Sequence, residues 1–485
     1  MTCMTALNLA ETAALIDGQW VRGEASFDVL NPADGTLIAA VADLGAAETT
    51  LAIDAAHRAL PAWAARTAKE RGAILRRWSE LILAHADDLA RLMTAEQGKP
   101  LAEARGEVVY GASFIDWFAE EAKRAYGHTI PTPMPGKRLA SIKQPVGVCA
   151  AIAPWNFPIA MITRKVGPAL AAGCTVVVKP AAETPLSALA IARLAIEAGV
   201  PAGVLNIVTT TRSSEVGKVL CDDSRVRKLS FTGSTPIGKV LYQQCAGTMK
   251  KLSLELGGNA PFIVFDDADL EAAVDGAIAS KYRNAGQTCV CANRLIVQSG
   301  IHDAFAARLA EKVAALKVGP GTGEGVQIGP LINEKALTKV VGLVSGAVQG
   351  GAEVLTGGDV HGLGGHFYQP TVLVGATPEM RIFQEEIFGP VAPIVKFETE
   401  AEAVELANAT PFGLAAYFYS RDVGRCWRVA EQIEAGMVGI NEGLISTEVA
   451  PFGGVKESGL GREGASEGLE EYLETKYLCF GGVAG

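Results

Sequence analysis

Basic charge is scarce in this sequence. Lys and Arg together number 43 against 53 Asp and Glu, which gives a formal net charge of −10. Nucleic acids and anionic membrane surfaces attract proteins with a basic footprint, so the deficit argues against both as partners. An anionic substrate would need positive charge concentrated in its own pocket.

Long apolar runs are also missing. The run from Ala169 to Val178 is interrupted by Gly173 and Thr175, which fits buried helix and strand better than a membrane span. Residues 1–19 have no basic segment before an apolar stretch and include Glu11 and Asp17, so they do not resemble a secretory signal. We therefore expect a cytoplasmic protein without a membrane partner.

Patterns that bind metal or form disulfide networks are absent too. Nine cysteines are scattered along the chain, and the six histidines have no ligand spacing with cysteines or carboxylates. A stapled secreted scaffold and a zinc site are both disfavoured. The 485 residues, 49% hydrophobic and 20% charged, are instead typical of a globular enzyme with about three domain-sized units. We expect chemistry that does not depend on a metal.

The apolar periodicity changes near Pro145. Residues 45–126 show the spacing of long helices. From there, strand-length apolar segments alternate with helical ones, and a second such series starts after Gly257 and Gly258. The pattern predicts an α/β protein with two doubly wound domains. Residues 137–143 and 471–480 are strand-like but belong to neither series, so we expect a small β arm.

A thiol follows a predicted helix that begins near Asp269. Cys289 lies in the stretch GQTCVC, rich in backbone N–H groups, whose field can lower the pKa of a nucleophilic thiol. Taken alone, such a cysteine is more often structural. A second feature is Glu255 in LSLELGGN, where burial on an apolar strand would raise the carboxyl pKa toward that of a general base. A buried ion pair is its alternative.

Two loops offer hydrogen-bond donors. The amide of Asn156, in PWNFP, could stabilise a developing oxyanion, although an asparagine between prolines is equally typical of a turn. Gly233 and Ser234, in FTGSTPIG, precede a predicted helix N-terminus that could bind a pyrophosphate. The latter stretch lacks the GxGxxG fingerprint, and by itself it is a weak signal.

Taken together, these stretches resemble the aldehyde dehydrogenase superfamily from about Ile16 onward. PWNFP, KPAAETP, FTGSTPIG, LELGGN, GQTC, EEIFGP and PFGGVKESGLGRE occur in the family's order. The resemblance implies a Rossmann-like NAD(P)-binding domain (1–130 and 148–256), a catalytic domain (257–455), and an oligomerisation arm with a C-terminal segment (131–147 and 456–485). It also implies a homodimer or homotetramer.

The resemblance assigns roles to individual residues. Cys289 would be the nucleophile, Asn156 with the Cys289 N–H would hold the oxyanion, and Glu255 would activate water. The residues that it implies for NAD or NADP binding are Trp155, Lys179, Ala182, Gly233, Ser234, Glu386 and Phe388. Many relatives that prefer NAD carry glutamate where this chain has Ala182, so we expect NADP to be accepted.

Within the family, the chain most resembles succinate-semialdehyde dehydrogenases, through ITRK, NEGLIS and the CVC triplet. Arg164 and Arg283 would clamp a compact anion bidentately, with Ser446 completing the site. The alternative is that each arginine caps a helix or pairs with a carboxylate. Cys291 would trap oxidised Cys289 as a disulfide, unless it simply packs.

Several alternatives stay open. Glutarate semialdehyde and sulfolactaldehyde are also ω-anionic aldehydes, and one methylene changes selectivity by only ~1–3 kcal/mol. A CoA-acylating enzyme is disfavoured by Glu255, and a non-catalytic protein on this scaffold by the joint presence of Cys289, Glu255 and Asn156. The stretch VTTTRSSEVG departs from the family where a glycine is expected after the first threonine, which leaves the local loop geometry in doubt.

Overall fold

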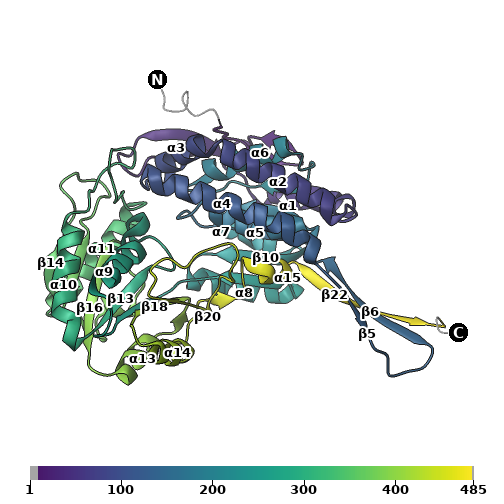
Figure 1. The fold of residues 1–485 in the computed structure, drawn as a ribbon. Helices are drawn as coiled ribbons and strands as arrows, with labels where there is room; N and C mark the ends of the chain where they lie inside the picture. The colour runs from purple at the N-terminus through teal and green to yellow at the C-terminus, as the bar shows by residue number, and fades with distance from the viewer. Residues whose placement is uncertain (1–8, 483–485) are drawn as a thin grey trace.

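The computed structural model describes residues 9–482 and has two α/β units from which a long β arm projects (Figure 1). The expectation about a secretory signal in residues 1–19 falls partly on residues 1–8, which lie outside the described residues. No helix of the described chain is long and apolar enough to cross a membrane.

The elements have the following bounds. The α-helices are α1 (Ala46–Ala64), α2 (Ala68–Ala84), α3 (Ala86–Gln97), α4 (Leu101–Glu121), α5 (Ala160–Ala172), α6 (Pro185–Ala198), α7 (Ser213–Asp222), α8 (Thr235–Cys245), α9 (Leu270–Tyr282), α10 (Ser299–Ala314), α11 (Glu334–Gln349), α12 (Arg381–Gln384), α13 (Glu400–Asn408), α14 (Val423–Gln432) and α15 (Ala465–Glu470). Short 3-10 helices are η2 (Ala122–Arg124), η3 (Ala246–Thr248) and η4 (Arg283–Gly286).

The strands that build the first unit and the arm are β1 (Ala14–Ile16), β2 (Gln19–Val21), β3 (Ser26–Leu30), β4 (Leu37–Ala42), β5 (His128–Ile130), β6 (Lys137–Pro145), β7 (Val148–Ile152), β8 (Thr175–Lys179), β9 (Leu205–Ile207), β10 (Val226–Thr232), β11 (Lys251–Glu255), β21 (Gly459–Leu460) and β22 (Leu473–Gly481). Those of the second unit are β12 (Ala260–Val264), β13 (Ala292–Gln298), β14 (Glu353–Thr356), β15 (Thr371–Val374), β16 (Val391–Phe397), β17 (Phe412–Gly413), β18 (Ala415–Tyr419), β19 (Met437–Ile440) and β20 (Val455–Lys456).

Helices α1–α4 form the expected helical region. Thr67 and Glu70 make a reciprocal capping box that starts α2, since each side chain accepts the other's backbone N–H. The left-handed Gly98 ends α3. The stretch 73–89, which has continuous helical spacing in the sequence, is divided at His85, where the backbone leaves the helical region (φ −104°, ψ 20°). Helix α4 packs on α2, α3 and α5.

The first sheet has the order β2-β1-β9-β8-β7-β10-β11-β21. Its five central strands are parallel, and antiparallel strands close both edges. Strands β7 and β8 are buried along their whole length, as expected for a parallel sheet with helices on both faces.

The second sheet has the order β14-β15-β16-β13-β12-β18-β19, and only the edge strand β14 is antiparallel. The chain passes directly from the carboxyl end of β11 to the amino end of β12 through Gly257 and Gly258. The carboxyl edge of the first sheet therefore lies next to the amino edge of the second.

The arm is a three-stranded antiparallel sheet, in the order β22-β6-β5, that extends away from both units (Figure 1). Strand β22 pairs with β6 over their full lengths, from Leu473 opposite Pro145 to Gly481 opposite Lys137. Before reaching the arm, the C-terminal segment returns to the first unit, where β21 extends the sheet and α15 packs on α4 and α5.

Candidate active site

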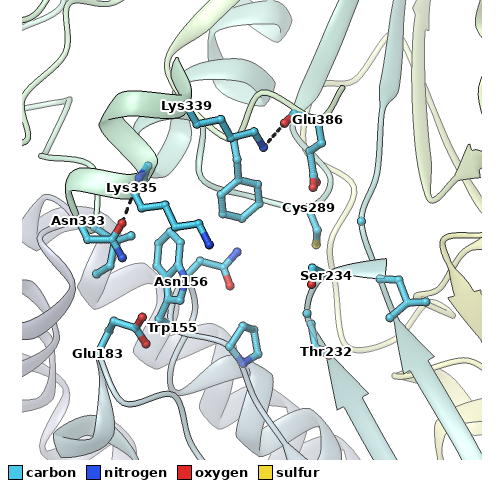
Figure 2. A pocket seen from close by; sticks show the side chains of 17 residues that line it. Trp155, Asn156, Glu183, Thr232, Ser234, Cys289, Asn333, Lys335, Lys339 and Glu386 are labelled. Carbon is cyan, nitrogen blue, oxygen red and sulfur yellow. Dashed lines mark hydrogen bonds between the residues drawn. The ribbon is translucent and has the colours of Figure 1, made fainter. Parts of the chain in front are cut away.

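A cavity of about 540 Å³ lies at the meeting point of the two sheets. Predicted site residues in its wall are Trp155, Asn156, Gly233, Ser234, Cys289, Glu386 and Phe388. Figure 2 shows Cys289 and Asn156 directed into this space. Loops after β7 and β10 supply the residues of the first unit, as is usual at the carboxyl ends of parallel strands.

Cys289 reaches the cavity from the loop between η4 and β13. Burial raises the pKa of its thiol to about 12, because the thiolate loses hydration, and the carboxylates of Glu386 and Glu255 add to the rise. Arg164 and Arg283 oppose it. In the free protein, the thiol is therefore neutral at neutral pH.

Asn156 is held by both units. Its Nδ2 donates to the carbonyl of Gln287 at 3.0 Å, and its own carbonyl accepts a hydrogen bond from Lys99 Nζ at 2.7 Å. Lys99 is itself buried and ion-paired with Glu107. One Nδ2 proton is thus engaged by the protein, which leaves the second for a ligand in the cavity.

Glu255 does not line the cavity. It ends β11 fully buried, and its two carboxyl oxygens have no hydrogen-bond partner among the described residues. Its charged neighbours are Glu463, Arg164 and Lys165, and a Cβ on Gly453 would lie 3.0 Å from its Oε1. Its pKa lies far above the ordinary value, mainly because of burial and secondarily because of the nearby Glu463 charge. The carboxyl group therefore lies in a polar cluster beside the cavity and within electrostatic range of Cys289.

The wall opposite the first unit carries Glu386. Its Oε1 accepts the Gly258 N–H at 3.1 Å, and burial raises its pKa to about 7. Lys339 Nζ donates to the Glu386 backbone carbonyl at 2.5 Å. Nearby, Phe388 makes an edge-to-face contact with Trp155, with ring centroids 5.6 Å apart. A carboxylate and an aromatic edge therefore frame one end of the cavity.

The N-terminus of α8 borders the cavity as expected. Ser234 precedes the helix without capping it through its side chain, so backbone N–H groups of the first turn are available to an anion. Lys335, on α11, extends into the same space (Figure 2). These donors and Glu386 fit a dinucleotide, whose phosphates need cations and N–H groups and whose ribose hydroxyls need an acceptor.

Lys179 and Ala182 lie outside the cavity wall. Lys179, at the end of β8, donates to the Pro180 carbonyl at 2.9 Å, and burial lowers its pKa to about 8. The adjacent Glu183 is exposed, lines the cavity and opposes this lowering. Glu183 belongs to the KPAAETP stretch, whereas no sequence motif singled out Lys335 or Lys339 as wall residues.

The two arginines have different surroundings. Arg283 shares a small hollow with Ser446, and its guanidinium lies 5.3 Å from the Phe157 ring centre. Arg164 is fully buried, pairs with Glu463 and lies 4.2 Å from the Phe452 ring centre. Arg164 therefore has the carboxylate partner that the sequence analysis gave as the alternative to an anion clamp.

Tyr110 lies within electrostatic range of both arginines. Burial raises the pKa of its hydroxyl, whereas Arg164 and Arg283 both act to lower it, and the Cys289 sulfur is a further neighbour. The Nη1 and Nη2 atoms of Arg164 have no hydrogen-bond partner among the described residues. The region next to Cys289 thus combines two guanidinium groups and a phenol, and the motifs did not indicate the phenol.

Cys291 faces the end of α9. Its buried thiol lies 3.0 Å from the carbonyls of both Ser280 and Lys281. It does not line the cavity, and Cys289 and Cys291 are both free thiols. This arrangement corresponds to the packing alternative.

The unusual loop after β9 accommodates its threonines without strain. Thr210, where a glycine was expected, is buried and does not adopt a left-handed backbone. Its hydroxyl accepts the Arg212 N–H at 2.9 Å. A threonine at this position therefore fits the local backbone, and a glycine is not required there.

Comparison with known proteins identifies the family of this chain. The model of the aldehyde dehydrogenase family matches residues 20–478. The chain belongs to this family. The predicted family and the predicted α/β fold are thereby confirmed.

Named relatives span nearly the whole chain. It is 61% identical to a succinate-semialdehyde dehydrogenase [NADP(+)] of Escherichia coli over 98% of each chain, and 60% identical to a glutarate-semialdehyde dehydrogenase of Pseudomonas aeruginosa over 97% and 98%. A 3-sulfolactaldehyde dehydrogenase of Pseudomonas putida is 58% identical over 98% of each. A solved succinate-semialdehyde dehydrogenase from Burkholderia pseudomallei, 59% identical, superposes over 98% of each chain with a TM-score of 0.97.

Proposed function

We propose that this aldehyde dehydrogenase oxidises an ω-anionic aldehyde to the acid with NADP or NAD, and that succinate semialdehyde is its first-choice substrate. One observation carries the proposal. Cys289 and Asn156 face a common cavity, while Arg164, Arg283 and Tyr110 surround the region beside the thiol. Because Arg164 is paired with Glu463, the positive charge that favours a small anion comes from Arg283, in a protein of net charge −10 that would otherwise repel it at long range.

In the proposed reaction, the Cys289 thiol gives its proton to water in the cavity, and the resulting thiolate adds to the aldehyde carbon. The free Nδ2 proton of Asn156 and the Cys289 N–H stabilise the resulting oxyanion. The bound cofactor supplies the hydride acceptor. Its phosphates are assigned to the α8 N-terminus and Lys335, and its ribose to Glu386. These contacts would hold the reacting carbon beside the cofactor. Loss of a hydride from the adduct to the cofactor would then leave a thioester on Cys289.

Hydrolysis of that thioester is assigned to Glu255. Burial raises the pKa of its carboxyl group, which makes the ionised carboxylate a stronger base toward water. The carboxyl group has Glu463, Arg164 and Lys165 as charged neighbours and is itself a charged neighbour of Cys289, which places it within range of the thioester. Water then attacks the thioester carbon, the thiolate leaves, and the acid is released.

The distal anion and chain length are tested with a substrate panel. Initial rates should be compared for succinate semialdehyde, glutarate semialdehyde, sulfolactaldehyde and butanal, each with NADP and NAD and without CoA. The proposal predicts that the anionic aldehydes exceed butanal in kcat/KM, with succinate semialdehyde first. A higher value for glutarate semialdehyde or sulfolactaldehyde would reassign the substrate. A requirement for CoA would replace hydrolysis by acyl transfer.

A further inference from the structure

The backbone before Cys289 takes an uncommon path. Asn284, Ala285 and Gly286 are consecutive left-handed residues, with φ of 53°, 53° and 75°. This conformation costs a non-glycine residue roughly 1–2 kcal/mol, and asparagine tolerates it better than alanine does. The surroundings must therefore hold this turn, which carries the chain from α9 to the cavity.

Asn284 makes several of the hydrogen bonds that stabilise this turn. It is 1% exposed. Its Oδ1 accepts from Gln97 Nε2 at 3.1 Å, and its backbone N–H donates to Glu103 Oε2 at 2.8 Å. Its carbonyl accepts from the backbone N and the Nε2 of Gln287, at 3.0 and 3.1 Å. Every one of these groups has a partner, as a buried amide requires.

The side-chain Nδ2 of Asn284 links two loops of the site. Its two protons reach two carbonyl oxygens, that of Asn156 at 3.0 Å and that of Gln287 at 3.3 Å. The Asn156 Nδ2 donates to the same Gln287 carbonyl at 3.0 Å. Asn284 therefore closes a ring of hydrogen bonds that joins the Asn156 loop to the loop of Cys289.

Lys99 shows why this ring matters. Its ammonium group also donates to the Asn156 carbonyl. It forms an ion pair with Glu107 of α4, and among the described residues it makes no hydrogen bond to the loop of Cys289. Lys99 thus anchors Asn156 within the first unit. The Asn284 amide connects it across the boundary between the units to the segment that carries the thiol.

We propose that Asn284 is a positioning residue of the oxyanion site: its amide sets the separation between the Asn156 amide and Cys289 while contacting neither substrate nor cofactor. The inference rests on the proposed function, because an oxyanion forms only when Cys289 adds to a carbonyl. A displacement of about 1 Å in such a site can cost about 10²-fold in rate.

Two variants separate the amide from the turn. Asn284→Gly keeps the left-handed backbone at no steric cost but removes the amide, and Asn284→Asp keeps the shape but presents an acceptor to two carbonyl oxygens. For Asn284→Gly we expect kcat to fall about 10- to 100-fold, and for Asn284→Asp at least as far. The KM values for aldehyde and cofactor should change by less than about threefold, since binding contacts are retained.

A double-mutant cycle with Asn156→Ala tests whether Asn284 acts through Asn156. Asn156→Ala alone should lower kcat by about 10²–10³-fold. In that background, Asn284→Gly should change kcat by no more than about twofold, because the group that it positions is gone. If the two losses multiply, or if Asn284→Gly alone keeps kcat within twofold of the parent, the proposal is overturned.

Asn206 offers a matched control for the loss of a buried amide. It is fully buried on β9, bonds three backbone groups and lies outside the cavity wall. Asn206→Gly should lower Tm and leave kcat unchanged, and an equal loss of kcat there would make the Asn284 effect one of stability.

The rate of Cys289 alkylation by iodoacetamide separates thiol reactivity from oxyanion stabilisation. It should stay within about threefold of the parent in Asn284→Gly, because alkylation forms no oxyanion, and a loss that parallels kcat would overturn the proposal. All rates use whichever aldehyde the parent oxidises, so a wrong substrate assignment leaves the test intact. A parent that oxidises no aldehyde would refute the proposed function itself.

Discussion

Replacing Arg283 by alanine should weaken catalysis selectively for anionic aldehydes. Arg283 is the cleaner of the two arginines to change, because it is half-buried and forms no ion pair among the described residues, although Glu103 is a charged neighbour. Arg164 is fully buried and neutralises Glu463. Its removal would leave that carboxylate with Lys165 alone and so would mix stability with substrate binding.

The size of the effect follows from the exposure of Arg283. Removing one partner of a desolvated charge pair costs about 2–5 kcal/mol. Because Arg283 is only half-buried, we expect its removal to cost an amount at the lower end of this range, about 2 kcal/mol. That free energy corresponds to a loss of roughly 30-fold in kcat/KM. Arg283→Lys keeps a charge without the planar fork, so it should recover part of this loss.

The assay compares initial rates of cofactor reduction with succinate semialdehyde and with butanal, a neutral aldehyde of matching length. Succinate semialdehyde should lose about 30-fold in kcat/KM, while butanal should change by less than about twofold because it has no distal charge to pair. Equal losses for the two aldehydes would make Arg283 structural. A parent enzyme that accepts butanal as well as succinate semialdehyde would refute the cationic pocket.

Three further outcomes follow from the site. Because Ala182 leaves no acid at the position three residues after Lys179, NADP should be accepted and Ala182→Glu should lower kcat/KM for NADP more than for NAD; a parent preference for NAD of a hundredfold would contradict this. Because burial raises the pKa of Cys289 to about 12, its alkylation by iodoacetamide should quicken about tenfold per pH unit from pH 7 to 10, with Cys289→Ala giving the background; a plateau by pH 8 would contradict the assignment. Because the Cys291 thiol faces the carbonyls of Ser280 and Lys281, Cys291→Ala should leave peroxide inactivation and its reversal by dithiothreitol unchanged; loss of reversibility would instead support a disulfide with Cys289.

The strand periodicity and the ordered motifs were sufficient to predict the two α/β units and the arm. Strand β7 is a continuous buried apolar run, and β8 and β16 each contain a shorter one; such runs are recognisable without long-range information. The short strands β1–β4 were not predicted. Each has three to six residues, and their pairing depends on contacts with each other or, for β1, with β9 far along the chain.

The site was predictable where a motif carries the side chain. Cys289, Asn156 and Glu386 all reach the cavity. Lys335 and Tyr110 come from helices without a motif, and only the tertiary packing of α11 and α4 brings Lys335 to the cavity and Tyr110 near Cys289. The surroundings of the Glu255 carboxyl group were equally hidden, because Glu463, whose charge helps to raise its pKa, lies more than 200 residues later.

The covalent role of Cys289 is tested most directly by the intact mass of Glu255→Gln after mixing with NADP and succinate semialdehyde. Without a base to activate water, the acyl-enzyme should accumulate, giving about one equivalent of reduced cofactor per site and then a stall. The mass should increase by one succinyl group, located on Cys289 by peptide mapping, and Cys289→Ala should show neither adduct nor cofactor reduction. Steady turnover by Cys289→Ala, or a burst in Glu255→Gln without any adduct, would contradict the mechanism.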